Sequence, residues 1–175
     1  MKSSFLCAAA SLAMHASTVP SANAAPTKAE ILAPIFKSYR AEIECLARAI
    51  YFEARSESTA GQHAVARVVL NRVDSDYYPD TVCGVVYQNQ HMRNACQFSF
   101  ACDGTNLAIQ EEPAFEKAMA LASVNYSCDS ACRAWQGDIA RSTHYHADYV
   151  NPFWSAKLER TGQVGSHIFY YTATR

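Results

Sequence analysis

The 175-residue sequence lacks an excess of charge of either sign. Charged residues make up 18% of the chain, the formal net charge is -1, and no run of like charges marks an acidic or basic tail. The sequence therefore gives no basic face with which to bind nucleic acid, and we expect no nucleic-acid partner. Half of the residues are hydrophobic, which excludes a disordered chain and is typical of one globular domain.

Motifs that identify several other classes of enzyme are also missing. The chain has no H-E-x-x-H pattern of a metallopeptidase, no G-x-S-x-G elbow of an acyl-transfer serine, and no glycine-rich phosphate loop. His144 and His146 alternate with Tyr145, so both imidazoles lie on one face if this segment is a strand. Such a pair could bind a metal with a third histidine. We favour the polar wall of a cleft and expect no metal site.

The long hydrophobic run of the chain lies at its N-terminus. Lys2 precedes an apolar run over residues 5–19, and small residues then form an A-x-A cleavage pattern that ends at Ala24. The run is shorter than the about 20 residues that a membrane span needs. We predict a cleaved signal peptide over residues 1–24, which makes the mature protein periplasmic or secreted and leaves it without a membrane anchor.

The cysteine content agrees with export. Cys7 lies within the predicted signal peptide, and an even number of cysteines in an exported chain implies up to three disulfides. Proximity favours local pairs, but a zinc site is the alternative interpretation of the closest spacings. Six cysteines remain in the mature chain. The local pairs would be Cys96 with Cys102 and Cys128 with Cys132, and the other two cysteines are Cys45 and Cys83.

The apolar pattern predicts helices first and a small sheet late. A first helix has apolar residues at spacings of three and four from Ile43, and a second is expected from about Ser58 until the segment 77–80. Shorter helices are expected over 80–86 and from Pro113. Strands are expected over 143–149 and 167–172, with Gly162 and Gly165 turning the chain before the second. This order predicts an α+β fold with a small antiparallel sheet.

One carboxylate lies on the apolar side of the first helix. Glu53 follows Leu46 and Ile50 at helical spacing, so it lies on the face that is expected to be buried. Burial raises the pKa of a carboxyl group, and a carboxyl that keeps its proton near neutral pH can act as a general acid. The alternative is a structural ion pair with an arginine, for which the candidates are Arg55, Arg67 and Arg72.

Two further groups could contact a ligand. The segment from Gln97 to Phe100 lies between two cysteines and could present Gln97 and Ser99 while a phenylalanine packs inward; an ordinary edge strand is equally consistent with its composition. Glu57 lies at a helix boundary, where it could cap or support the helix, or act as a second carboxylate opposite Glu53.

Several ordered blocks of residues resemble the SleB-type cell wall hydrolases, known from spore-cortex-lytic enzymes. The resemblance extends over about residues 42–171, which points to a catalytic domain over 40–175 preceded by a lead segment over 25–39. One departure is Ser56, where the family usually has glycine. Among the blocks are Ile50-Tyr51-x-Glu53-Ala54-Arg55-x-Glu57, Asn71-Arg72-Val73, Cys96-Gln97-Phe98-Ser99 and Thr143-His144-Tyr145-His146.

The resemblance implies a lysozyme-like catalytic domain that cleaves peptidoglycan glycan strands between N-acetylmuramic acid and N-acetylglucosamine. The implied mechanism is lytic transglycosylation with Glu53 as general acid and then base, without a metal or organic cofactor. We also expect a monomer. The alternatives are a hydrolase that uses Glu57, Asp103 or Asp148 as a second carboxylate, and a non-catalytic wall-binding module. The residues expected to contact substrate are Gln97, Ser99, His144, Tyr145, His146 and Glu57.

Overall fold

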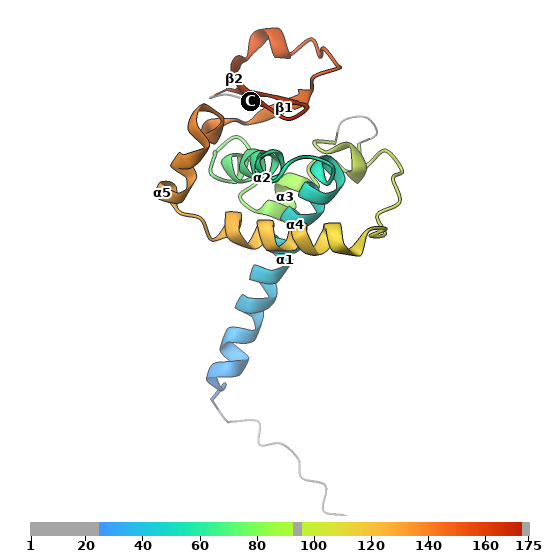
Figure 1. Ribbon diagram of the computed structural model, residues 1–175. Helices are drawn as coiled ribbons and strands as arrows, with labels where there is room; N and C mark the ends of the chain where they lie inside the picture. The colour runs from blue at the N-terminus through green and yellow to red at the C-terminus, as the bar shows by residue number, and fades with distance from the viewer. Residues whose placement is uncertain (1–24, 93–95, 173–175) are drawn as a thin grey trace, which may run out of the picture.

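The computed structural model describes residues 25–92 and 96–172, so the predicted signal peptide over 1–24 lies outside the described residues. A helical body carries a small sheet on one side, and the first helix projects from the opposite side (Figure 1). The helices and strands are α1 (Lys28–Ala54), α2 (Thr59–Val73), α3 (Val82–Val86), η1 (Ser99–Ala101), α4 (Glu112–Tyr126), α5 (Ser130–Arg133), η2 (Ala134–Arg141), β1 (His144–Ala147), η3 (Ser155–Lys157), β2 (Glu159–Val164) and β3 (His167–Tyr171).

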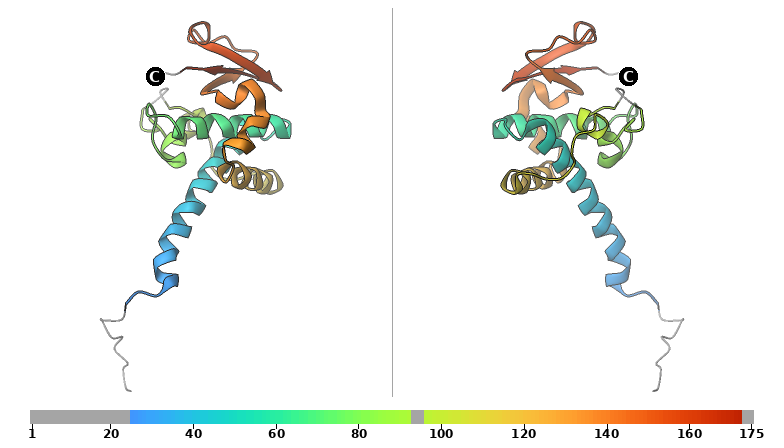
Figure 2. Two further views of the ribbon diagram at one scale, coloured as in Figure 1. Left: turned by 90° about the vertical axis from the view of Figure 1, so that its left-hand side faces the viewer. Right: turned by 90° about the vertical axis from the view of Figure 1, so that its right-hand side faces the viewer.

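Helix α1 begins well before the first residue of the predicted helical pattern. Thr27 and Glu30 form a capping box, in which each side chain accepts a hydrogen bond from the backbone N–H of the other. The predicted lead segment is therefore largely helical, and it projects from the body in every view (Figure 2). Within the described ranges, no helix has the length and apolarity needed to cross a membrane.

The C-terminal half of α1 forms the centre of the core. Leu46, Ala47 and Ile50 are completely buried, and this part of α1 packs against α2, α3 and α4. Helix α2 begins after Ser58, which confirms the predicted start, and the Ser58 side chain caps the helix. The predicted helices at α3 and α4 are also present, with Pro113 in the first turn of α4.

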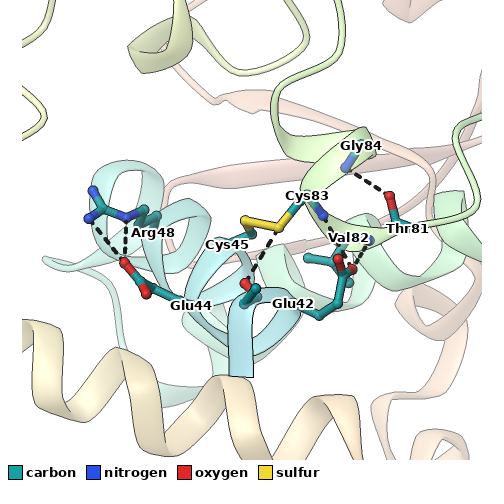
Figure 3. Close-up of a disulfide and its surroundings, with 9 residues drawn as sticks. Glu42, Glu44, Cys45, Arg48, Thr81, Val82, Cys83 and Gly84 are labelled. Atoms are coloured by element: carbon teal, nitrogen blue, oxygen red, sulfur yellow. Dashed lines mark hydrogen bonds and ion pairs between the residues drawn. A yellow bond between two sulfur atoms is a disulfide. The ribbon is translucent and has the colours of Figure 1, made fainter. Parts of the chain in front are cut away.

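A disulfide between Cys45 and Cys83 joins α1 to α3 (Figure 3). Next to it, the Glu42 carboxylate accepts hydrogen bonds from the backbone N–H groups of Val82 at 2.5 Å and Cys83 at 3.4 Å, so α1 caps the N-terminus of α3. The other disulfides join Cys96 to Cys102 and Cys128 to Cys132, which confirms both predicted local pairs.

The C-terminal sheet is antiparallel with the strand order β1-β3-β2, and the predicted α+β fold is confirmed. Phe169 of β3 is completely buried against Ala64 and Val68 of α2, so the sheet is fixed to the helical body. The predicted turn at Gly162 is wrong, because this glycine lies within β2 beside an irregularity in the pairing with β3. Gly165, with a φ of 58°, does lie in the turn between β2 and β3.

Candidate active site

A cavity of about 900 Å³ opens between the end of α1 and the C-terminal sheet. Its walls come from the last turns of α1, from Arg72 on α2, from the segments 97–100 and 105–110, and from β1 with the start of the following loop. Segments far apart in the sequence therefore meet at one site. Among the described residues that line it, Glu53 is the one carboxylate.

Glu53 lies in the last turn of α1, directly after the buried part of that helix. Its Oε2 accepts a hydrogen bond from the Tyr145 hydroxyl at 3.1 Å. Burial raises the pKa of Glu53, the hydrogen bond from Tyr145 lowers it, and the negative charge of Asp103 raises it further; burial is the largest of the three effects. Because the net shift is upward, the carboxyl keeps its proton to higher pH than an exposed glutamate.

None of the three candidate arginines forms an ion pair with Glu53 among the described contacts. Arg55 pairs with Glu111 at 2.9 Å, and the Arg67 Nε donates to the Gln136 side chain at 3.3 Å. The predicted structural alternative for Glu53 is therefore not observed.

Arg72 occupies a buried position in the wall of the cavity. Its Nε donates to the backbone carbonyl of Thr143 at 2.7 Å, and its guanidinium lies over the rings of Tyr78 and Phe98. With the Gln97 amide turned so that its oxygen faces the guanidinium, that oxygen accepts from Nη1 at 3.0 Å and from Nη2 at 3.2 Å. Arg72 thus connects the 97–100 segment to the start of β1 and fixes two walls of the cavity.

Tyr145 is positioned by the sheet. It pairs with Phe169 in the register of β1 and β3, and its ring lies 5.1 Å from the ring of His167 and 5.8 Å from that of Phe169. Burial and the neighbouring Glu53 raise the pKa of Tyr145 well above its ordinary value. The phenol therefore stays neutral and acts toward Glu53 as a hydrogen-bond donor.

The two histidines of β1 lie on the same face, as predicted, and both contact Trp154, at 5.5 Å and 5.6 Å between ring centroids. His146 stacks on Tyr170, hydrogen-bonds its hydroxyl at 3.0 Å, and borders the cavity. His144 lies outside the cavity, and burial lowers its pKa to about 4. Its predicted contact with substrate is not supported by this placement. The described residues contain no group of three side chains able to hold a metal ion.

The segment from Gln97 to Phe100 is not an edge strand. Residues Ser99–Ala101 form a short 3-10 helix, and both Phe98 and Phe100 are buried. Gln97 and Ser99 line the cavity, and their contact with substrate stays a prediction. The structure thus brings Gln97 and Ser99 together with Glu53 and Tyr145.

Glu57 lies away from the cavity and holds the turn between β2 and β3. Its carboxylate accepts a hydrogen bond from the Ser166 hydroxyl and another from the Ser166 backbone N–H at 3.4 Å, and the His167 Nδ1 lies 4.0 Å away. The predicted contact of Glu57 with substrate is not supported, because the carboxylate faces the turn. The physical reason is that α1 ends at Ala54 and the chain turns before α2.

Other residues of the cavity were not predicted from the sequence. Arg55, Asn106 and Gln110 contribute polar groups, and Tyr149 contributes an exposed ring. The segment with Gln110 is fixed by the Tyr51 hydroxyl, which accepts hydrogen bonds from the backbone N–H groups of Gln110 and Glu111 at 3.2 and 3.1 Å. These residues lie in irregular segments, where no periodic pattern marks which side chains face a site.

Comparison with known proteins assigns the family. A family model described as Cell Wall Hydrolase matches residues 56–170, so the chain belongs to the cell wall hydrolase family of enzymes. The spore cortex-lytic enzymes of Oceanobacillus iheyensis and Bacillus subtilis are 30% and 28% identical to it over 128 residues, or 73% of the chain. Those alignments cover 41% and 37% of the two relatives, so the chain spans about two fifths of their length.

Solved structures agree with this assignment. The catalytic domain of the Bacillus cereus SleB protein superposes with a TM-score of 0.54 at 28% identity, covering 74% of this chain and 89% of that domain. The catalytic domain of the germination-specific lytic transglycosylase SleB from Bacillus anthracis matches with the same TM-score at 29% identity, covering 74% of this chain and 93% of that one. The α+β fold is thus that of the SleB catalytic domain. Glu53 lies just before the first residue matched by the family model.

Ser56 lies in the turn that follows α1. Among the described residues, Asn89 is the only residue other than glycine with a positive φ. Ser56 therefore has a negative φ, and the turn after α1 does not need the conformational freedom of glycine.

Proposed function

We propose that this chain cleaves the glycan strands of peptidoglycan between N-acetylmuramic acid and N-acetylglucosamine, as a lytic transglycosylase with Glu53 as the general acid and then the base. The observation that carries this proposal is the one carboxyl among the described residues that line the cavity, the pKa of which is raised by burial. Membership of the cell wall hydrolase family supports the substrate class. The SleB catalytic domain named as a lytic transglycosylase supports the reaction type.

The proposed reaction needs one carboxyl for two proton transfers. In the first step, protonated Glu53 donates to the glycosidic oxygen as the bond from that oxygen to C1 of the muramic acid breaks. In the second step, the resulting carboxylate accepts the proton of the C6 hydroxyl as that oxygen bonds to C1. The product is a 1,6-anhydro ring, and Glu53 is protonated again. Tyr145, which donates to Oε2, stabilises the carboxylate between the two steps.

The site of action that fits this proposal is outside the cytoplasm. Peptidoglycan lies there, and the predicted signal peptide over residues 1–24 gives a route of export. We propose a periplasmic or secreted protein that acts as a monomer on glycan strands.

The test is digestion of purified peptidoglycan followed by mass spectrometry of the products. We expect 1,6-anhydromuramic ends from the wild type, and a loss of at least about 100-fold in rate for Glu53→Gln, which keeps the shape of the side chain but cannot transfer the proton. Glu57→Gln is the matched control, because it makes the same chemical change outside the cavity. Reducing ends would indicate a hydrolase, and undiminished cleavage by Glu53→Gln would exclude Glu53 as the acid.

A further inference from the structure

An exposed aromatic ring lies at the edge of the cavity. Tyr149 follows β1 directly and lines the cavity, yet it is 84% exposed. A single exposed aromatic side chain needs no functional explanation by itself. Tyr149 differs from such a residue because it lines the same cavity as Glu53 and lies on an anchored chain segment, so a ligand in the cavity can reach its ring.

The backbone on both sides of Tyr149 is anchored. The Asp148 N–H donates to the Ser166 carbonyl at 2.8 Å, and the Val150 N–H donates to the Ala147 carbonyl at 3.0 Å. These bonds fix the start of the β1–β2 loop, while the ring itself remains exposed. With the backbone anchored, only the side-chain torsions of Tyr149 remain to be ordered when a ligand covers the ring, which keeps the entropic cost of binding small.

The cavity also offers polar groups that suit a sugar. Asn106 and Gln110 contribute amides, which donate and accept hydrogen bonds, and Gln97 and Ser99 add further polar side chains. A pyranose ring has an apolar C–H face and a rim of hydroxyl and acetamido groups. An exposed aromatic ring and a set of amides at one cavity are therefore complementary to it.

We infer that Tyr149 is a sugar-binding residue, on whose ring one saccharide unit of the glycan strand stacks. This inference rests on the proposed function, because it takes the glycan strand as the ligand. It assigns the β1–β2 loop a part in holding the polymer, while Glu53 performs the proton transfers. We expect Tyr149 to contribute to binding of the strand and not to the chemical step.

The same loop provides a matched control. Phe153 is 82% exposed, close to the value for Tyr149, but it lies outside the cavity and has the Lys157 ammonium 5.5 Å above its ring. Phe153→Ala therefore removes an equally exposed ring from the same loop without changing the cavity.

The experiment measures binding of the full chain to insoluble peptidoglycan by co-sedimentation, in the Glu53→Gln background so that the polymer stays intact. We expect Tyr149→Ala to weaken binding by about tenfold, on the scale of stacking on an aromatic side chain. Tyr149→Phe and Tyr149→Trp should retain binding, because they keep the ring, and Phe153→Ala should leave it unchanged. With Glu53 intact, Tyr149→Ala should raise KM and leave kcat nearly unchanged.

Two results would overturn the inference. Undiminished binding by Tyr149→Ala shows that the ring does not hold the strand, and equal losses for Tyr149→Phe and Tyr149→Ala show that the hydroxyl acts instead of the ring. Either result leaves the proposed function intact if Glu53→Gln still abolishes cleavage. If the wild type neither binds nor cleaves peptidoglycan, the proposed function itself fails.

Discussion

At the scale of single residues, the proposed mechanism depends on how readily Glu53 gives up its proton. Burial and the Tyr145 hydroxyl act on its pKa in opposite directions, and burial has the larger effect. The carboxyl is thus biased toward the acid form, while the hydrogen bond limits the cost of forming the carboxylate. A residue that acts first as acid and then as base requires this compromise.

Tyr145→Phe tests the contribution of the hydrogen bond. Because the bond lowers the pKa of Glu53, its loss should raise that pKa, and the alkaline limb of the kcat/KM profile against pH should move to higher pH. Asp103→Asn should move the limb the opposite way, since the charge of Asp103 raises the same pKa. Limbs that stay in place in both variants would show that another group controls the profile.

The same shift predicts a pH dependence of stability. A carboxyl whose pKa is raised in the folded protein binds protons more tightly there than in the unfolded chain, so its stabilising effect is complete below the unfolded pKa. This effect is lost as pH rises through the folded pKa. Thermal melts of Glu53→Gln and wild type should therefore differ little in acid and diverge with rising pH, with the variant gaining relative stability. A constant difference would contradict the raised pKa.

The sequence predicts that Glu53 lies on the buried side of its helix, but it does not predict which residues surround it. Its place on the apolar face follows from spacing along one helix, which is a local property. Tyr145 lies 92 residues further on, and its contact with Glu53 exists only because β3 packs on α2. Glu57 likewise contacts a turn that is distant in the sequence, the one between β2 and β3. Local patterns could not predict either contact.

At the scale of elements, the turn between β2 and β3 depends on Gly165. A Cβ added there would lie 1.9 Å from the Glu57 Oε2, and the φ of 58° disfavours other residues. Gly165→Ala should lower Tm by roughly 5 to 10 °C, which corresponds to about 2 to 3 kcal/mol in a domain of this size.

A double-mutant cycle separates the two causes. Glu57→Ala removes the atoms that meet the new Cβ, so adding it to Gly165→Ala should cost less than the sum of the two single changes. Additive losses would show that the carboxylate moves aside freely and that backbone strain alone destabilises the variant.

Elements that bury an apolar face could be predicted from the sequence more readily than the exposed edge strand. Helices α2, α3 and α4 have apolar residues at helical spacing, with capping side chains before α2 and α3 and a proline in the first turn of α4. Strand β3 is largely buried and rich in aromatic residues. Strand β2 is an edge strand in which no residue is fully buried, so its sequence has no clear alternation of apolar and polar residues. Gly162 therefore indicates a turn and not part of a strand when the sequence is considered alone.

At the scale of the whole molecule, three disulfides fix different parts of one body. Cys45–Cys83 joins the central helix to α3 across 38 positions, whereas Cys128–Cys132 closes a span of four after α4. The two local pairs could be predicted because their cysteines lie close together in the sequence. The long pair follows only by elimination, and its effect depends on which elements it joins.

The long disulfide should contribute more to global stability than the short one. In the chain-entropy model, a disulfide raises the free energy of the unfolded chain by lowering its conformational entropy. The increase is about 4 kcal/mol for the longer loop and about 2 kcal/mol for the shorter one. We therefore expect the double substitution of Cys45 and Cys83 by alanine to lower the free energy of unfolding about twice as much as that of Cys128 and Cys132. Guanidinium unfolding of both variants and the wild type provides the measurement, with the short pair as the matched control. Equal losses would show that native contacts around each disulfide, such as the Glu42 cap on α3, outweigh the entropy of the unfolded chain.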